Sequence, residues 1–344
     1  MQKYMTLFVA HTPFQLYIAN HMLFTMSEFK DKDNYIIIDM DYDENKIEKN
    51  MWKKIILNRK PIGAYFDKNI NERKKLMDYL KDDIFDKYEN VEFLLPNIIY
   101  PLNNYFYGLS KQSKKYFLSS YPEGLASIIL KKIPYSEILK NYTKYIYYKL
   151  KNIRFYTYSG DICGSKYCEK IYSITPDLIS SKCKNIISIP KLCDLHKKQK
   201  DKNICLILGQ PYYNYIEESE YLLILNDMIN FVKDKNFKTV YYKPHHCEDD
   251  RILNIFSKKG IKIVEDNRCI EELIMNENMG YIIGFTSSAL VNLKLIYGEK
   301  IESVSFKPKK ILIESEKNKV GIYKVKDYES FERVFQYTNV KVIK

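Results

Sequence analysis

Two short apolar runs in the second half of the chain lead into side chains that could bind a phosphate. The first ends in Lys243, a proline and His245, which delivers an imidazole to the exit of a strand, where it could protonate or hydrogen-bond a leaving group. The second opens onto Thr286, Ser287 and Ser288 ahead of an apolar helix. A hydroxyl-capped helix N-terminus offers free N–H groups and the positive end of its dipole to an anion. The pattern predicts a phosphate site at the carboxyl edge of a parallel sheet.

The first half of the chain supplies a candidate carboxylate. Glu123 follows a predicted strand and precedes Gly124, which permits close approach of a ligand. A carboxylate at this position could take the proton from an acceptor hydroxyl. Each candidate also has a structural reading: His245 as a cap of the sheet edge, the Ser and Thr residues as an ordinary helix cap worth about 1 kcal/mol, and Glu123 as a solvated turn residue.

The acidic stretch Asp39-Met40-Asp41-Tyr42-Asp43 is a rival motif. It resembles the Asp-x-Asp that holds Mn²⁺ and a nucleotide diphosphate in GT-A glycosyltransferases. A calcium loop of the EF-hand kind is excluded, because its sixth position would be Glu44 instead of glycine. Three acids in a loop that continues with further polar residues are more typical of a solvated turn, and we predict no metal site.

The elements that must position these side chains alternate along the first half. Apolar runs predict strands, and longer amphipathic patterns predict helices between them. Such alternation is typical of a parallel sheet covered on both faces. The predicted strands are 4–10, 35–39, 91–95, 115–119 and 171–174, and the predicted helices are 14–26 and 125–131.

The pattern restarts after a polar stretch between Cys193 and Lys202, which predicts the inter-domain linker. Strands are predicted at 203–208, 238–242, 261–264, 280–285 and 302–306, and helices at 218–233, 250–258, 270–276 and 287–297. The predicted fold class is α/β, with two Rossmann-like domains facing across a cleft, the layout called GT-B in glycosyltransferases. The predicted domains are residues 1–195 and 203–326, and residues 327–344 form a helix and tail that pack back across the linker.

Composition limits the classes of partner and compartment. The 344 residues suit two domains, and 46% apolar with 28% charged residues is typical of a globular protein. The net charge of +12 comes with no nucleic-acid recognition motif, so we predict no nucleic-acid partner. Seven cysteines without a Cys-x-x-Cys pair indicate reduced thiols. Without a signal peptide or a long apolar stretch, we predict a cytoplasmic protein whose membrane contact would be peripheral, on the inner face of the cytoplasmic membrane.

Taken together, these segments resemble the bacterial sialyltransferases, and especially glycosyltransferase family 52, whose members include lipooligosaccharide and capsule sialyltransferases. Two departures stand out: Pro122 replaces the first acid of an acid-acid-Gly motif, and His246 replaces the proline after the motif histidine. The likeness runs from about residue 5 to residue 298 and is carried by Thr12-Pro13-Phe14-Gln15, Glu123-Gly124, Lys243-Pro244-His245, Ser287-Ser288, Leu208-Gly209-Gln210-Pro211 and the stretch 164–176.

The resemblance implies an inverting sialyltransferase that moves sialic acid from CMP-sialic acid to a galactose-containing glycan of lipooligosaccharide or capsule. It implies that Glu123 is the general base, with Glu217 and Glu218 as fallback candidates. Because CMP leaves as a monophosphate, no divalent metal or other cofactor is expected. The family also suggests a homodimer. The implied donor site comprises His245, Ser287, Ser288, Thr286, Lys243, Gly209 and Gln210, with Glu271 or Glu272 hydrogen-bonding the ribose.

Other functions remain compatible with the sequence. A GT-B glycosyltransferase using a UDP-hexose or CMP-Kdo donor would share the fold and the phosphate site. A nonenzymatic nucleotide- or sugar-binding module would keep the fold without turnover, and a peripheral membrane or nucleic-acid binder would act through the net charge. Acceptor specificity is expected around 103–114, where Tyr105, Phe106 and Tyr107 could stack on a sugar or belong to the core.

Overall fold

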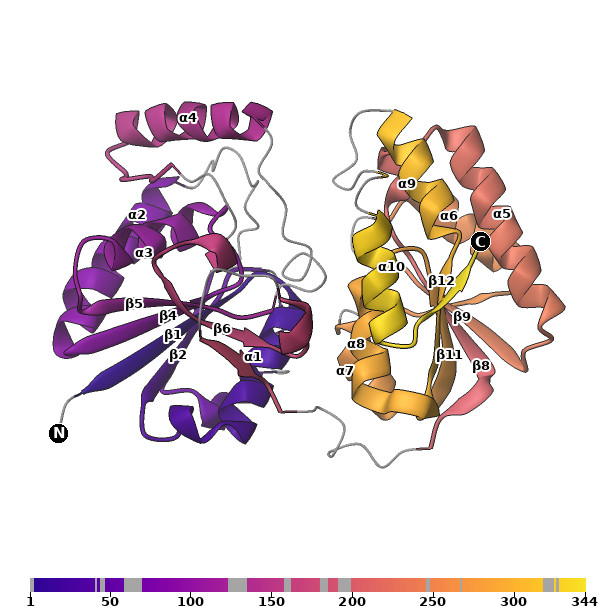
Figure 1. The fold of residues 1–344 in the computed structure, drawn as a ribbon, viewed down its shortest axis with the longest axis horizontal. Helices are drawn as coiled ribbons and strands as arrows, with labels where there is room; N and C mark the ends of the chain where they lie inside the picture. The colour runs from indigo at the N-terminus through magenta and orange to yellow at the C-terminus, as the bar shows by residue number, and fades with distance from the viewer. Residues whose placement is uncertain are drawn as a thin grey trace. The chain divides into compact units, whose positions relative to one another are not determined.

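The chain folds into two compact units, Met1–Pro190 and Lys191–Lys344. The structure is a computed structural model that describes residues 3–40, 42–43, 47–58, 70–122, 135–157, 162–179, 185–190, 199–245, 248–266, 268–317, 325 and 328–344. Figure 1 shows the elements of each unit along the chain. The sequence places the boundary between residues 195 and 203, a few residues beyond the end of the first unit.

The N-terminal unit is built on a seven-stranded parallel sheet with the order β3-β2-β1-β4-β5-β6-β7. β1 is an inner strand, between β2 and β4, and its residues Leu7 and Phe8 are fully buried. The strands are β1 Tyr4–Ala10, β2 Asp33–Ile38, β3 Lys54–Leu57, β4 Asn90–Leu95, β5 Tyr116–Ser120, β6 Cys168–Ser173 and β7 Ile186–Ser188.

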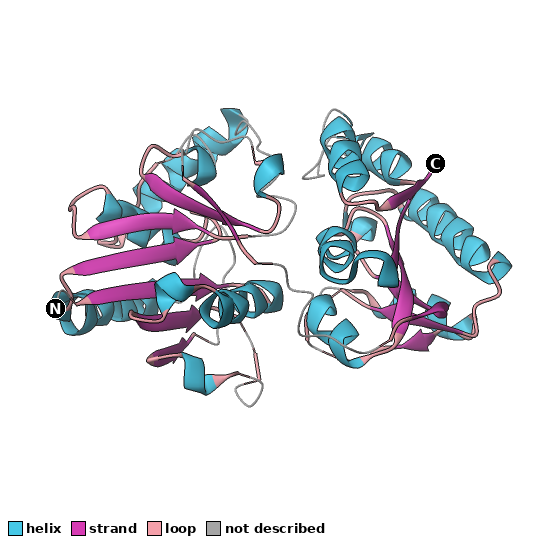
Figure 2. Ribbon diagram, turned by 60° about the horizontal axis from the view of Figure 1, so that its bottom comes forward, coloured by secondary structure: helices cyan, strands magenta, loops and turns pink. Residues whose placement is uncertain are grey.

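Helices lie on both faces of this sheet (Figure 2) because β1 buries apolar side chains on each side. Met5, Leu7 and Val9 alternate into a core cluster that includes residues of α2 and α3. Phe8 points the other way and contacts the rings of Phe29 and Trp52. The helices are α1 Pro13–Thr25, α2 Ile70–Tyr79, which continues as a π-helical turn at Leu80–Ile84, α3 Pro101–Ser110 and α4 Tyr135–Leu150.

The C-terminal unit is built on a six-stranded parallel sheet with the order β10-β9-β8-β11-β12-β13. Its central strand β8 pairs with β9 on one side and β11 on the other. The strands are β8 Asp201–Leu208, β9 Thr239–Lys243, β10 Lys262–Ile263, β11 Met279–Gly284, β12 Glu302–Phe306 and β13 Lys341–Ile343.

In this unit α5 and α6 lie on one face of the sheet, and α7 and α8 lie on the other (Figure 1). The face under α5 and α6 forms a core cluster of side chains such as Ile224, Phe256 and Ile283. α8 is buried along most of its length, which explains its apolar sequence. The helices are α5 Glu218–Asp234, α6 Asp250–Lys258, α7 Ile270–Asn276, α8 Ser288–Tyr297, α9 Pro308–Lys317 and α10 Tyr328–Tyr337.

The predicted α/β class is confirmed, since both sheets are parallel and carry helices. The bounds of β1, α6, α7 and β12 match the sequence patterns residue for residue. Strands β3, β7 and β13 and helices α2, α3, α4 and α9 were not predicted. The segment predicted at 125–131 lies outside the described residues.

One predicted segment has different surroundings from those expected. Residues 103–114, expected to form an acceptor loop, mostly belong to α3, and Phe106 and Tyr107 are buried in the core while Tyr105 packs against it. In the C-terminal segment 327–344, α10 packs on α9 and β13, and β13 pairs with β12; most of the predicted linker lies outside the described residues. None of the described helices combines the length and apolar character needed to cross a bilayer.

Candidate active site

The strand order of the C-terminal unit marks a ligand site at the end of β8. The chain leaves β8 for β9 and β10 on one side, then returns to β11 and β12 on the other. At such a reversal the crossovers diverge, and ligands bind outside the carboxyl ends of the strands. Residues 209 and 210 follow β8 at this point, so both predicted donor-site residues lie at the reversal.

Gln210 joins the exits of β8 and β11. Its Oε1 accepts hydrogen bonds from the backbone N–H groups of Phe285, at 3.0 Å, and Thr286, at 2.9 Å. Both of these residues are buried. A single side-chain oxygen therefore satisfies two N–H groups and fixes the segment that leads into α8.

The N-terminus of α8 presents the two predicted serines at this edge. Ser287 is the N-cap, and its hydroxyl accepts from the N–H of Ala289 at 3.3 Å. Ser288 is the first residue of the helix, and both serines are half-buried. The serine hydroxyls and the positive dipole end of this ten-residue helix can receive a phosphate here.

Thr286 has a structural position instead. It is 5% exposed, and its hydroxyl hydrogen-bonds to the Tyr212 hydroxyl. Burial raises the pKa of Tyr212 to about 12, so the phenol keeps its proton at neutral pH. Thr286 therefore supports the turn before the serines, while its own hydroxyl is already used.

His245 lies two residues past the end of β9, and its backbone N–H is bound by the Glu248 carboxylate. The N–H of His245 donates to Glu248 Oε2 at 3.2 Å, and the Tyr242 hydroxyl donates to the same oxygen at 2.8 Å. Gly209 makes this packing possible: a Cβ there would lie 2.5 Å from Glu248 Oε2 and 2.8 Å from His245 N. Only glycine leaves room at the end of β8 for this arrangement.

Glu248 is a residue that the sequence did not single out. Its second oxygen, Oε1, is buried and has no hydrogen-bond partner within the described part of the chain. Burial raises the pKa of Glu248 above its ordinary value. In sequence it begins a Glu-Asp-Asp run ahead of α6, a pattern that also fits a solvated helix start, so only its packing under Gly209 distinguishes it.

Lys243 faces the neighbouring loop between β10 and α7. Its Nζ donates to the backbone oxygen of Asp266. The Asp266 carboxylate in turn pairs with Arg268 at 2.6 Å, and this hydrogen-bonded pair lowers the pKa of Asp266. Lys243 thus joins the exits of β9 and β10 and adds positive charge near the predicted phosphate site.

The two candidate ribose ligands differ in their surroundings. Glu271 is 3% exposed and accepts from Asn292 Nδ2 at 2.8 Å, and burial raises its pKa. Its carboxyl is therefore used inside the unit, between α7 and α8. Glu272 is half-buried in the first turn of α7, which leaves it as the better placed of the two for a ligand outside the strand ends.

The N-terminal unit has its own reversal, between β1 and β4, with an ion-pair cluster at the strand ends. Asp39, after β2, has a fully buried side chain. His11 Nδ1 lies 3.1 Å from Asp39 Oδ2, Arg73 Nη1 lies 3.3 Å from Oδ1, and Asn58 Nδ2 donates to Oδ1 at 2.8 Å. These contacts occupy the Asp39 carboxylate, so it serves as the anchor of this cluster rather than as half of an exposed Asp-x-Asp motif.

The ring of His11 is fixed on two sides. It stacks on Tyr100, with centroids 4.1 Å apart, and its Nδ1 faces Asp39. Its Nε2 is buried and has no hydrogen-bond partner among the residues described. When Nδ1 donates to the carboxylate, Nε2 keeps a lone pair that can accept a hydrogen bond. In the sequence His11 directly follows the first predicted strand, 4–10, and Asp39 ends the next, 35–39, but their pairing depends on the register of β1 and β2.

The remaining predicted residues divide into two groups. Glu123 and Asp41 lie outside the described residues. Glu217 and Glu218 are exposed at the start of α5, where Glu218 pairs with Arg251 at 3.0 Å. Within the described ranges, no three His, Cys, Asp or Glu side chains come together in a group that could hold a metal ion.

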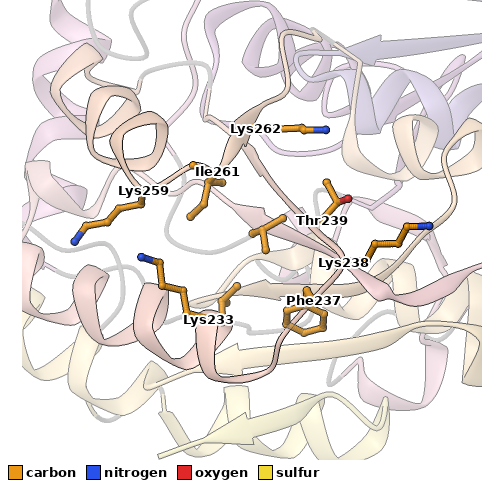
Figure 3. A pocket seen from close by; sticks show the side chains of 10 residues that line it. Lys233, Phe237, Lys238, Thr239, Lys259, Ile261 and Lys262 are labelled. Atoms are coloured by element: carbon orange, nitrogen blue, oxygen red, sulfur yellow. The ribbon is translucent and has the colours of Figure 1, made fainter.

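A separate hollow of about 260 Å³ lies at the other end of β9 (Figure 3). Lys233, Lys238, Lys259 and Lys262 surround it, with Phe237 in its lining. Its strand residue Thr239 begins β9, whereas His245 follows the end of that strand. The hollow is therefore not part of the candidate active site.

Comparison with known proteins gives one family and several structural relatives. The family model of alpha-2,8-polysialyltransferases matches residues 6–304. None of the curated proteins matches the chain significantly. The α/β-galactoside α2,3-sialyltransferase of Photobacterium phosphoreum is 12% identical, with a TM-score of 0.55 over 99% of both chains.

Two further solved structures have other names and the same general fold. UGT71G1 of Medicago truncatula, complexed with UDP-glucose, is 10% identical, with a TM-score of 0.52 over all of this chain and 85% of its own. The UDP-GlcNAc 2-epimerase of Methanocaldococcus jannaschii is 14% identical, with a TM-score of 0.50 over 97% of this chain and 99% of its own. At these identities the likeness concerns the fold, two Rossmann-like domains.

Proposed function

Because the chain belongs to the alpha-2,8-polysialyltransferase family, a family of glycosyltransferases that use a nucleotide-sugar donor and a glycan acceptor, we propose that it transfers sialic acid from CMP-sialic acid. The observation that carries the proposal is the edge around residues 209 and 210. Gly209 packs against the backbone of His245, and Gln210 bonds the segment that enters α8. A histidine and a serine-capped helix N-terminus thus follow β9 and β11, the two strands that flank β8, which suits a monophosphate leaving group.

The proposed donor site uses the C-terminal unit. Ser287, Ser288 and the N–H groups of α8 would hold the CMP phosphate, and His245 would donate a proton or hydrogen bond to it as negative charge develops. Glu272 would bind the ribose, because the Glu271 carboxyl is buried and occupied by Asn292. Glu248 would position His245 through its backbone N–H.

The proposed reaction inverts the anomeric centre. The oxygen of an acceptor hydroxyl attacks the anomeric carbon of sialic acid as the bond from that carbon to the CMP phosphate oxygen breaks. Glu123 would take the hydroxyl proton, and CMP would leave with its charge stabilised by His245 and α8. We propose that no divalent metal takes part, because a monophosphate leaving group can be stabilised by these donors alone.

Two classes of acceptor deserve comparison. We propose a galactose-containing glycan of lipooligosaccharide or capsule as the acceptor, as the sequence motifs suggest. The family description favours a second candidate, a glycan that already ends in sialic acid. Lactose and N-acetyllactosamine represent the first class, and sialyllactose represents the second.

The decisive measurement is CMP release from CMP-sialic acid in the presence of EDTA, with and without each acceptor. We expect acceptor-stimulated release by the wild-type protein and a loss of at least a hundredfold in His245→Ala, the lower range for removing a general acid. Glu123→Gln should lose turnover while keeping its affinity for CMP. The proposal would be contradicted if the protein released UDP from UDP-hexoses, or CMP from CMP-Kdo, instead of CMP from CMP-sialic acid, or if it were active only with Mn²⁺. CMP binding without any turnover would favour the nonenzymatic module.

A further inference from the structure

Helix α4 exposes a continuous row of large apolar side chains. The row follows the spacing i, i+4, i+7, i+11 and i+15, so its members share one face of the helix. We name it the α4 stripe: Tyr135, Leu139, Tyr142, Ile146 and Leu150, which are 82%, 60%, 54%, 57% and 78% exposed. Figure 1 shows α4 at the top of the N-terminal unit.

The opposite face of α4, which packs on the protein, is partly polar. Asn141 and Lys144 are 0% and 1% exposed. Tyr148 lies on the same side and belongs to the N-terminal core cluster, where its ring stacks on Phe155 at 5.1 Å. A surface helix ordinarily buries its apolar face and exposes its polar face. Helix α4 departs from this rule, because its exposed face is apolar and its buried face is partly polar.

This arrangement indicates a binding surface. Single exposed apolar residues are common on soluble proteins, but a contiguous apolar row rimmed by polar residues marks a contact with a protein or a membrane. The row runs along the whole helix, whose sixteen residues span about 24 Å at 1.5 Å per residue.

The charge around the α4 stripe is positive. Lys140 and Lys149 are exposed on either side of it, and Lys151 is exposed just beyond its end. The helix sequence has three lysines, Lys140, Lys144 and Lys149, and one acid, Glu137. An apolar face bordered by lysines is complementary to a surface that combines hydrocarbon with negative charge, and anionic phospholipid has both properties.

We propose that the α4 stripe docks the protein on an anionic phospholipid surface. The helix lies in the plane of the surface, with Leu139, Ile146 and Leu150 entering the boundary of the acyl chains. Tyr135 and Tyr142 suit the headgroup level, because each has an apolar ring and a polar tip. The lysines contact the phosphates, which makes binding weaker at high salt.

The test is co-sedimentation of the full chain with vesicles of phosphatidylcholine alone or mixed with phosphatidylglycerol. We expect the wild-type protein to bind the mixed vesicles and to bind phosphatidylcholine at least tenfold more weakly. The double substitution Leu139→Glu and Ile146→Glu should reduce binding to the mixed vesicles at least tenfold. Lys140→Glu with Lys149→Glu should remove the preference for phosphatidylglycerol.

A matched control is Leu223→Glu on α5, which places the same charge at a leucine that is 55% exposed in the other unit. Its binding should stay within twofold of the wild type. Far-UV circular dichroism verifies that each variant is folded, as expected for exposed positions. Tyr135→Trp provides a direct reading: its emission should shift to the blue on addition of mixed vesicles, against the background of the buried Trp52.

Three results would overturn the proposal. The first is no binding to either kind of vesicle, and the second is binding that the α4 substitutions leave unchanged. The third is a wild-type dimer, measured by light scattering, that becomes a monomer on Leu139→Glu and Ile146→Glu while vesicle binding is absent. That last result would assign the α4 stripe to a second copy of the chain.

Discussion

Substituting Gln210 by alanine should destabilise the C-terminal unit selectively. The Gln210 oxygen is the acceptor for two backbone N–H groups, those of Phe285 and Thr286, in buried residues. A buried donor that loses its partner costs about 1–3 kcal/mol. At the low end of that range for each N–H group, Gln210→Ala lowers the free energy of unfolding by about 2 kcal/mol. For a unit of about 150 residues, this corresponds to a fall of about 4–8 °C in the melting temperature.

The chain carries an internal control for this measurement. Its single tryptophan, Trp52, is buried in the N-terminal unit and donates to Asn20 at 3.0 Å. Tryptophan fluorescence therefore follows the N-terminal unit, whereas far-UV circular dichroism follows both units. Gln210→Ala should lower the melting temperature of a transition seen by circular dichroism and leave the melting temperature of the fluorescence transition unchanged.

The matched control for Gln210→Ala is Gln336→Ala, at an exposed glutamine on α10 of the same unit. Its melting temperature should stay close to that of the wild type, because surface substitutions usually change stability by less than about 0.5 kcal/mol. Gln210→Ala should also weaken CMP binding in calorimetry, since the segment it releases leads to Ser287. A fall of less than about 2 °C for Gln210→Ala would refute the reasoning, because it would mean that water satisfies both N–H groups at little cost.

Three further results are expected. Arg73→Met should lower the free energy of unfolding of the N-terminal unit by about 3–5 kcal/mol, because it leaves the buried Asp39 carboxylate without its guanidinium partner. The measurement is a denaturant titration followed by tryptophan fluorescence, and an unchanged free energy would show that the pair contributes nothing. Burial raises the pKa of Glu271, so the folded protein binds this proton more tightly than the unfolded chain, and stability should fall as pH rises from the ordinary glutamate range through the raised pKa. Glu271→Gln should flatten that part of the stability-against-pH curve, and an equally steep curve would contradict the assignment. Gly209→Ala should weaken CMP binding at least tenfold in calorimetry, because its Cβ would displace His245, while Gly164→Ala, with nothing within 4 Å of its Cβ, should bind like the wild type; equal affinities would mean that the loop shifts freely.

The local patterns of the sequence were enough for most elements of the second half of the chain, although not for α9 and β13. Helix α6 begins after Asp249, whose side chain caps the helix by accepting from Arg251 N, and α7 carries acids in its first turn. Signals of this kind lie within a few residues of each other, so they can be recognised without the tertiary structure. The same holds for the Ser287 cap of α8.

The first half was harder to predict because its elements depend on packing. Helix α3 contains Gly108 and two asparagines, and Asn104 is held by hydrogen bonds to the backbone of Tyr156, 52 residues away. Helix α4 exposes a row of apolar residues and buries Asn141 and Lys144, which departs from the usual amphipathic pattern. Strand β3 is short, and its pairing with β2 places it at the edge of the sheet.

The sequence by itself determined the α/β class, the positions of the strand ends that carry His245, Gly209 and Ser287, and the likeness to sialyltransferases. These depend on short-range periodicity and on the order of motifs along the chain. The tertiary structure decided which side chains meet: Glu248 under Gly209, Gln210 on the β11 exit, and Asp39 with His11. Such partners lie on different strands or loops, and strand order and register, which arise from the packing of the whole sheet, bring them within hydrogen-bond distance.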